Sequence, residues 1–182
     1  KHGFNTVIPN VLWSGVAYYP SDIVPPSSVV AQDGDQMKWI VKYGRESNMK
    51  IHAWKVMFQF AENWLAPGDV VDPYIQSHRM QVDDKGQQTK ALTPCLAENV
   101  EYEVKALEEV ASKYDIDGVH LDYIRFLGVN VDYHPGCQKP FEKWSQKKVG
   151  AWPKDVLKGG SLYSDYENFK IELIKSEKNT RL

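Results

Sequence analysis

Three short segments of the chain have the pattern of β-strands. Residues 5–13 are rich in β-forming residues, and side chains alternate between two faces along residues 50–58 and 118–123, the last lying within the informative stretch 115–126. In that stretch Val119 and Leu121 alternate with His120 and Asp122, so one strand face is apolar and the other ionisable. A buried charged carboxylate is costly unless it is paired. The polar face therefore predicts a functional site or an obligatory hydrogen-bond network.

Apolar residues recur at helical spacing between and after these strands. Residues 35–48, 98–113 and 163–178 are predicted to be amphipathic helices, the first with Asp35 as its N-cap and Asn48 as its C-terminal stop. Alternating strands and helices predict an α/β fold whose three strands lie parallel, in chain order, with helical crossovers. Such a sheet has open edges, which predict self-association or neighbouring strands.

Two strands repeat one design near their carboxyl ends. His52 and Trp54 share a face of the second strand, as His120 and Asp122 share a face of the third. Ligands of parallel α/β folds bind at that end of the sheet. We therefore expect the four side chains to line a common site.

Two connections that follow strands are long enough to be lids or binding loops. Residues 61–93 contain a predicted hairpin around 83–86, and residues 127–162 contain a predicted short helix at 141–144. Their aromatic rings either stack on sugars or pack the loops onto the scaffold, and both possibilities stay open. These rings are Trp64, Tyr74, Tyr133, Phe141, Trp144 and Trp152.

Composition narrows the classes of function only a little. A chain of 182 residues that is 42% hydrophobic can bury a core, and a net charge of -2 gives no electrostatic case for nucleic acid or an anionic membrane. We expect no cofactor and no membrane-spanning segment, and any export signal would lie outside this chain. Cys95 and Cys137 are either a disulfide or two free thiols.

Several motifs together resemble the family 10 glycosyl-hydrolase-like proteins, a group of bacterial TIM-barrel proteins regarded as glycosidases and often exported or lipid-anchored. The most specific is Asp-Gly-Val-His-Leu-Asp-Tyr-Ile-Arg at 117–125. Others are Gly-Phe-Asn-Thr-Val at 3–7, Pro-Asn-Val-Leu-Trp at 9–13, Ala-Tyr-Tyr-Pro-Ser at 17–21, Gly-Asp-Gln at 34–36, His-Ala-Trp-Lys-Val at 52–56 and Trp-Pro-Lys-Asp-Val-Leu at 152–157. Family members often carry further cysteines just before Cys137, where this chain has Asp132 and His134. That departure argues against a cysteine-based metal site.

The resemblance implies a partial TIM (β/α)8 barrel with parallel strands and long βα loops. A complete barrel takes about 250 residues, so residues 1–182 would be one catalytic-type domain fragment with about three βα units, resembling barrel strands 2 to 4. It also implies a secreted or lipid-anchored protein, in the periplasm, at the cell surface or outside the cell.

By the same resemblance, Asp122 is the candidate nucleophile or general base of a glycoside hydrolase. Its alternative role is to anchor Arg125 or a loop amide. Glycoside hydrolysis requires a second carboxyl about 5 to 9 Å away. Glu62 is the candidate within this chain, although a glutamate on a strand outside it is the stronger expectation. The fragment alone is then expected to be inactive.

The remaining candidates would bind the carbohydrate substrate. Sugar hydroxyls would bind Asn10, His52 and His120; aromatic contacts would come from Tyr18, Tyr19, Trp54, Trp64 and Tyr123; and Lys55 and Arg125 would be clamps at the rim. Tyr18 and Tyr19 lie either at the pocket edge or packed beneath it. Two other functions stay open: a carbohydrate-binding module without catalysis, and a metal-dependent hydrolase that uses His52, His120 and Asp122.

Overall fold

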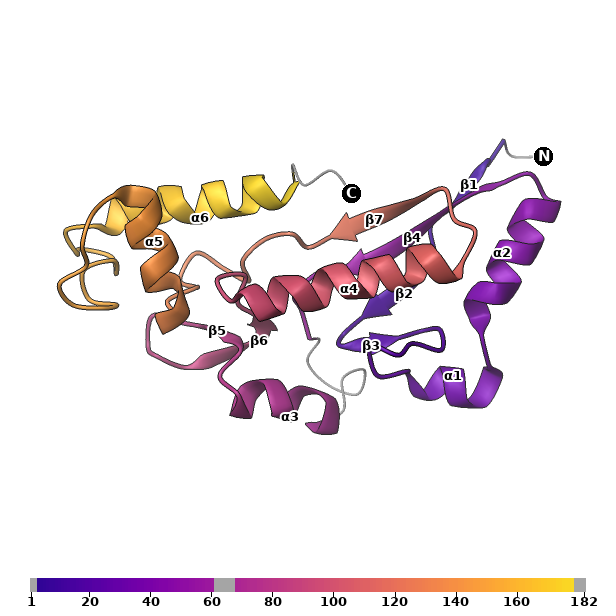
Figure 1. Cartoon of the computed structure of the whole chain (residues 1–182), viewed down its shortest axis with the longest axis horizontal. Coiled ribbons are helices and arrows are strands. Elements are labelled where there is room, and N and C mark those ends of the chain that lie inside the picture. The colour runs from indigo at the N-terminus through magenta and orange to yellow at the C-terminus, as the bar shows by residue number, and fades with distance from the viewer. Residues whose placement is uncertain (1–2, 61–67, 179–182) are drawn as a thin grey trace. The chain divides into compact units, whose positions relative to one another are not determined.

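The computed structural model describes residues 3–60 and 68–178, which form two compact units (Figure 1). Unit 1 comprises Lys1–Pro73 and Val100–Tyr123, and unit 2 comprises Tyr74–Asn99 and Ile124–Leu182. The fold is mixed α/β with parallel strands, as predicted. That the whole chain is one catalytic-type domain fragment stays a prediction.

Unit 1 is built on a sheet with β4 (Lys50–Val56) at its centre. On one side β4 pairs in parallel with β1 (Thr6–Val7) and β2 (Asn10–Trp13), and on the other with β7 (Gly118–Asp122). The predicted order and direction of the three strands are thus confirmed. The first predicted strand is broken between β1 and β2 at Pro9, which has no N–H for a ladder hydrogen bond. A short strand that was not predicted, β3 (Val16–Ala17), folds back antiparallel on β2.

The helices of unit 1 are α1 (Ser28–Asp33), α2 (Gln36–Glu46) and most of α4 (Ala97–Lys113). Asp35 caps α2 as predicted, since its carboxylate accepts the Lys38 N–H at 3.0 Å. Asn48 follows the helix in the left-handed region with φ 54°, which ends the helix where predicted. Helix α1 was not predicted. The core lies between the sheet and the helices and includes Met37, Ala53 and Val110.

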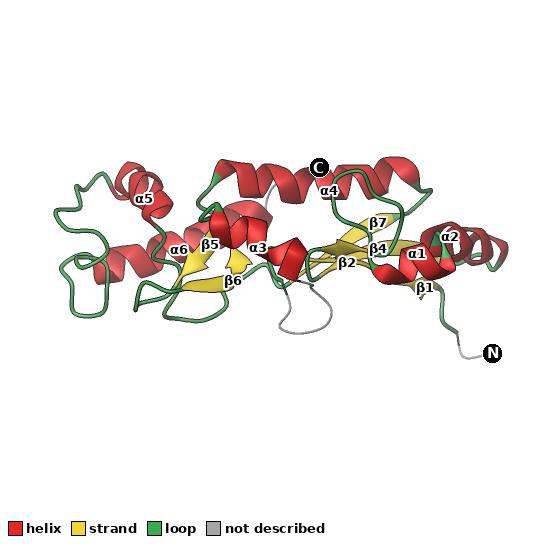
Figure 2. Ribbon diagram, turned by 90° about the horizontal axis from the view of Figure 1, so that it is seen from below, coloured by secondary structure: helices red, strands yellow, loops and turns green. Residues whose placement is uncertain are grey.

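Unit 2 contains the hairpin of β5 (Met80–Val82) and β6 (Gln88–Leu92), which confirms the turn predicted at 83–86. The single turn η1 (Pro135–Cys137) follows. The next elements are α5 (Gln138–Ser145) and α6 (Tyr163–Lys178), both labelled in Figure 2. Helix α3 (Gly68–Gln76) crosses the boundary between the units. Aromatic rings form the core of unit 2, among them Tyr133, Phe141, Tyr166 and Phe169. No helix in the described part of the chain is both long and apolar enough to cross a membrane.

Candidate functional site on the open face of the sheet

The register of the sheet gathers the predicted polar residues on one face. Val119 and Ala53 belong to or pack on the core under the helices, so the residues that alternate with them lie on the opposite face. On that face Trp54 pairs with Asn10 on β2 and with His120 on β7. Asn10, Trp54 and His120 therefore form a row across three strands.

Asp122 lies one step further towards the carboxyl end of β7, opposite Val56. Its Oδ1 accepts the backbone N–H of Tyr123 at 2.8 Å, and its carbonyl accepts the Met57 N–H at 2.9 Å. Tyr123 has φ 55° and Phe58, just after β4, has φ 58°. Left-handed conformations are costly for non-glycine residues and often occur at functional sites. Both strands thus turn sharply at the end where the site was predicted.

Two buried polar atoms in the row have unused hydrogen-bonding capacity. Asn10 Oδ1 and Trp54 Nε1 are each covered from solvent without a hydrogen-bond partner among the described residues. One is an acceptor and the other a donor. A hydroxyl group can serve both at once, because it donates one hydrogen bond and accepts others. Each atom would gain a hydrogen bond from a hydroxyl group that reached it.

His52 lies deeper on the same face, opposite Gly118 of β7. A Cβ atom built on Gly118 would lie 3.3 Å from His52 Nδ1. The glycine therefore leaves the space that the imidazole ring occupies. The predicted sharing of this face by His52, Trp54, His120 and Asp122 is confirmed.

Lys55 does not lie at the rim, so that expected position is wrong. It alternates with Trp54 and points to the helix side, where its Nζ lies 2.9 Å from Glu103 Oε2 of α4. The exposed fractions of the two side chains are 6% and 3%. Glu103 Oε1 also accepts the Phe58 N–H at 3.1 Å, so this buried ion pair holds the turn after β4 in place.

Glu103 was not among the predicted residues, although a signal was present in the sequence. The residue falls between Val100 and Leu107 on the apolar stripe of the helix. An acid at such a position requires a buried partner. The alternation of β4 places Lys55 on the face that packs against that stripe.

Tyr19 is packed beneath the sheet site rather than at its edge. Its side chain is fully buried, and its hydroxyl donates to Glu109 Oε2 at 2.9 Å. Burial alone would raise the pKa of Glu109. This effect of burial is outweighed by four hydrogen bonds to the Glu109 carboxylate, from Ser21, the Asp22 N–H, Lys113 and Tyr19. The pKa of Glu109 therefore lies below its ordinary value. Tyr19 thus stabilises unit 1, whereas Tyr18 is only partly buried.

The other predicted residues are not at the paired strand positions that form the row, or they lie outside the described residues. Glu62 and Trp64 lie outside them. Tyr123 is 42% exposed directly after β7. Arg125 is exposed and belongs to unit 2.

The ligand set proposed for a metal-dependent hydrolase is not brought together. His52 pairs with Gly118, four residues before Asp122 on β7, a separation of about 13 Å along the strand. In the described residues the one group with metal-ligand spacing is Cys95, Asp132 and Cys137 in unit 2. These cysteines form a disulfide, whereas metals bind the thiolate.

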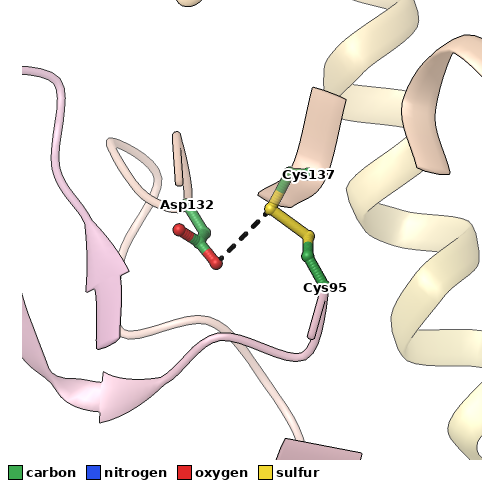
Figure 3. Close-up of side chains that lie close together, drawn as sticks. All are labelled: Cys95, Asp132 and Cys137. Carbon is green, nitrogen blue, oxygen red and sulfur yellow. Dashed lines mark hydrogen bonds between the residues drawn. A yellow bond between two sulfur atoms is a disulfide. The ribbon is translucent and has the colours of Figure 1, made fainter. Parts of the chain in front are cut away.

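Asp132 lies beside that disulfide and is itself fully buried (Figure 3). Burial raises its pKa, against hydrogen bonds from Thr93 and the backbone N–H groups of Val82 and His134. Cys137 Sγ lies 3.7 Å from Asp132 Oδ2. Because a disulfide sulfur carries no proton, this contact is a hydrogen bond only when the protonated carboxyl donates to the sulfur. The raised pKa of Asp132 widens the pH range over which its carboxyl is protonated.

Sequence comparison decides the family of the chain. The profile of the family described as "Glycosyl hydrolase-like 10" matches residues 1–174. The chain belongs to this family. The predicted resemblance is therefore confirmed over nearly the whole chain.

Similar proteins extend far beyond the length of this chain. An S-layer-related protein of Niallia circulans is 26% identical over 189 residues, which cover 90% of this chain and 12% of the relative. Glycosyl hydrolase YngK of Bacillus subtilis is 29% identical, and the match covers 67% of this chain and 25% of the relative. Glycosyl hydrolase DigH of Escherichia coli K12 is 27% identical, and the match covers 66% of this chain and 30% of the relative. The chain thus spans less than a third of each relative.

A solved structure shares the fold. The α-L-fucosidase isoenzyme 2 from Paenibacillus thiaminolyticus aligns with 94% of this chain and 25% of its own, with a TM-score of 0.50 and 16% sequence identity. At this identity the likeness concerns the fold alone. It agrees with the parallel arrangement of β2, β4 and β7.

Proposed function

We propose that this chain supplies part of the active site of a glycoside hydrolase, with Asp122 as its nucleophile or general base. The observation that carries the proposal is the position of Asp122 at the carboxyl end of β7, on the face that also holds Asn10, Trp54 and His120. Ligand sites of parallel α/β folds lie at this end. Membership of the glycosyl hydrolase-like 10 family supports the same chemistry.

In this proposal the three parallel strands are strands 2 to 4 of a TIM barrel, and residues 1–182 are a fragment of one catalytic-type domain. The face that carries Asp122 is the barrel interior. The unpartnered Asn10 Oδ1 and Trp54 Nε1 bind a substrate hydroxyl, and His120 orients the sugar or the carboxylate of Asp122. The parent protein is exported, in line with the S-layer-related relative.

Hydrolysis also requires a second carboxyl across the scissile bond. Asp122 is the one carboxylate at the paired positions on this face of the described strands. The partner is therefore Glu62 or, as we favour, a glutamate outside this chain. With the partner outside this chain, residues 1–182 alone are inactive. The missing partner in the described sheet also favours one second candidate, a carbohydrate-binding module that keeps the face without catalysis.

Asp122→Asn in the complete parent protein tests the proposal, because asparagine keeps the shape of the side chain and removes its charge. Hydrolysis of a panel of 4-nitrophenyl glycosides and soluble oligosaccharides should fall by several orders of magnitude, with melting temperature and sugar binding unchanged. Asp72→Asn, at an exposed site on α3, is the control and should leave the rate unchanged. A lower melting temperature, together with a rate that falls only in proportion to the fraction of unfolded protein, would instead make Asp122 a structural anchor. Sugar binding by a wild-type parent that hydrolyses nothing would establish the binding module.

A further inference from the structure

Unit 2 contains a hollow of about 490 Å³, and none of the residues that line it belongs to the sheet site. It is lined by the β5–β6 hairpin, by the segment around Tyr133 and by Trp152 with Pro153. All of these residues belong to unit 2. The volume lies within the range of about 300 to 1,000 Å³ that is usual for small-molecule sites.

The aromatic floor of this hollow is held rigidly. Trp152 donates its indole N–H to the Tyr133 carbonyl at 3.1 Å and packs edge-on against Tyr166 with ring centroids 5.4 Å apart. Tyr133 stacks on Tyr166 with ring centroids 5.8 Å apart. Trp152 is only partly buried, so it contributes to the lining while its position is fixed by the core. Aromatic side chains that are already held in position lose little conformational entropy when a ligand binds.

The histidine in the lining is fixed as well. His134 Nδ1 accepts the Gly136 N–H at 2.9 Å. The proton of the neutral ring therefore lies on Nε2, which donates to the His78 carbonyl at 2.7 Å. Both ring nitrogens are thus already hydrogen-bonded within the protein. His134 therefore lines the hollow with its ring but offers no hydrogen bond to a ligand.

Gln88 provides an acceptor without a partner. Its Nε2 donates to the Ile75 carbonyl at 3.0 Å, which fixes the orientation of the amide. Its Oε1 is covered from solvent and has no hydrogen-bond partner among the described residues. A buried acceptor of this kind costs free energy until a donor reaches it. Asp83 adds a carboxylate to the same lining.

The lining therefore combines flat apolar surfaces with acceptors, and it contains no lysine or arginine. A ligand that fits must carry no negative charge, must donate hydrogen bonds and must present an apolar face. The hydroxyls and C–H faces of a neutral pyranose meet these requirements, whereas an anionic sugar would be repelled by Asp83. We propose that the hollow of unit 2 is a second saccharide site, where a neutral pyranose stacks on Trp152 and, once the Gln88 side chain turns towards the hollow, donates a hydrogen bond to Gln88 Oε1. The choice of a saccharide rests on the proposed function.

The test follows the two sites separately through the indole N–H signals of Trp54 and Trp152 in ¹⁵N NMR spectra of the 182-residue chain. The signals are assigned with Trp54→Phe and Trp152→Phe. The probes are tetramers of N-acetylglucosamine, cellobiose-type glucose, maltose-type glucose and mannose, with tetragalacturonate as the anionic counterpart. We expect at least one neutral tetramer to shift the Trp152 signal and tetragalacturonate to leave it unchanged.

Gln88→Leu should weaken this binding about tenfold, from the loss of one buried hydrogen bond. The matched control is Gln87→Leu, at the neighbouring exposed residue outside the lining, and it should bind as the wild type does. A Trp152 signal that none of the neutral tetramers shifts, or an affinity equal in Gln88→Leu and Gln87→Leu while both fold, would overturn the proposal. Failure at this site leaves the Trp54 signal and the effect of Asp122→Asn to report on the sheet site, so the two proposals fail separately.

Discussion

Glu103 in unit 1 and Asp132 in unit 2 are both carboxylates shielded from solvent, yet their surroundings differ in charge. Glu103 faces the ammonium of Lys55 at 2.9 Å. Asp132 faces backbone N–H groups, a threonine and a disulfide, and burial raises its pKa. One unit stabilises a buried acid by pairing its charge, and the other by favouring its protonated form. The difference predicts opposite sensitivities to mutation and to pH.

The largest effect is expected from breaking the ion pair. Glu103→Gln leaves Lys55 charged and buried without its partner, which should lower the free energy of unfolding by about 3 to 5 kcal/mol. Urea denaturation followed by circular dichroism measures the change. The double variant Lys55→Met/Glu103→Leu removes both charges and should recover most of the loss. If the double variant were as unstable as the single one, the ion pair would stabilise the fold by more than the neutralisation of one buried charge by the other.

In unit 2 the corresponding covalent constraint is the disulfide between the loop after β6 and η1. Cys95→Ala/Cys137→Ala should cost about 2 to 4 kcal/mol. Amide hydrogen exchange should show the loss in β5, β6 and α5, with α2 and β4 protected as before. Equal loss of protection in both units would mean that they unfold as one cooperative body.

The two units should also respond to pH in opposite directions. The folded pKa of Asp132 is raised above its ordinary 3.8. Its stabilisation is therefore complete below that pH and is lost as the pH rises through the folded pKa. The pKa of Glu109 is lowered from 4.5, so its contribution is present above that value and is lost as the pH falls through the folded pKa.

Asp132→Asn separates these contributions, because an asparagine oxygen can still accept the Val82 and His134 N–H groups. Hydrogen exchange at several pH values between about 3 and 7 should show that unit 2 no longer weakens as the pH rises. Unit 1 should keep its weakening at low pH. A pH dependence of unit 2 that survives the substitution would assign it to another group.

The smallest effect is expected from Tyr19→Phe, which removes one hydrogen bond to Glu109 but keeps its other donors. The free energy of unfolding should fall by about 1 kcal/mol. Thermal denaturation at neutral pH measures it. A loss as large as that of Glu103→Gln would mean that Tyr19 and Glu109 form a second indispensable charged network in unit 1.

The parallel sheet and the polar face of unit 1 could be predicted because alternation along a strand is a local property of the sequence. It also placed His52, Trp54, His120 and Asp122 correctly on one face. The partner of Lys55 could not be predicted in this way, because it lies on a helix far along the chain and follows from packing. For the same reason the sequence left Tyr19 open between the pocket edge and a packed position beneath it, since either side of an extended segment can face the core.

Unit 2 was less accessible to sequence reasoning. The hairpin and α6 follow from a turn motif and from helical spacing, and both were predicted. The disulfide joins two cysteines that lie 42 residues apart in the sequence, and the aromatic core depends on contacts between Tyr133, Phe141 and Tyr166. Neither feature leaves a periodic signal in the sequence. Whether an aromatic ring packs in the core or stacks on a sugar depends on which other side chains bury it.

The glycine of β7 that faces His52 has a consequence for the history of the family. Because a methyl group at position 118 would lie 3.3 Å from the imidazole ring of His52, a larger residue there requires the ring to shift by a few tenths of an ångström. The two positions should therefore change together among relatives. Lineages that have lost the histidine should be the ones in which alanine or serine replaces the glycine, and an alignment of the family would display this linked inheritance.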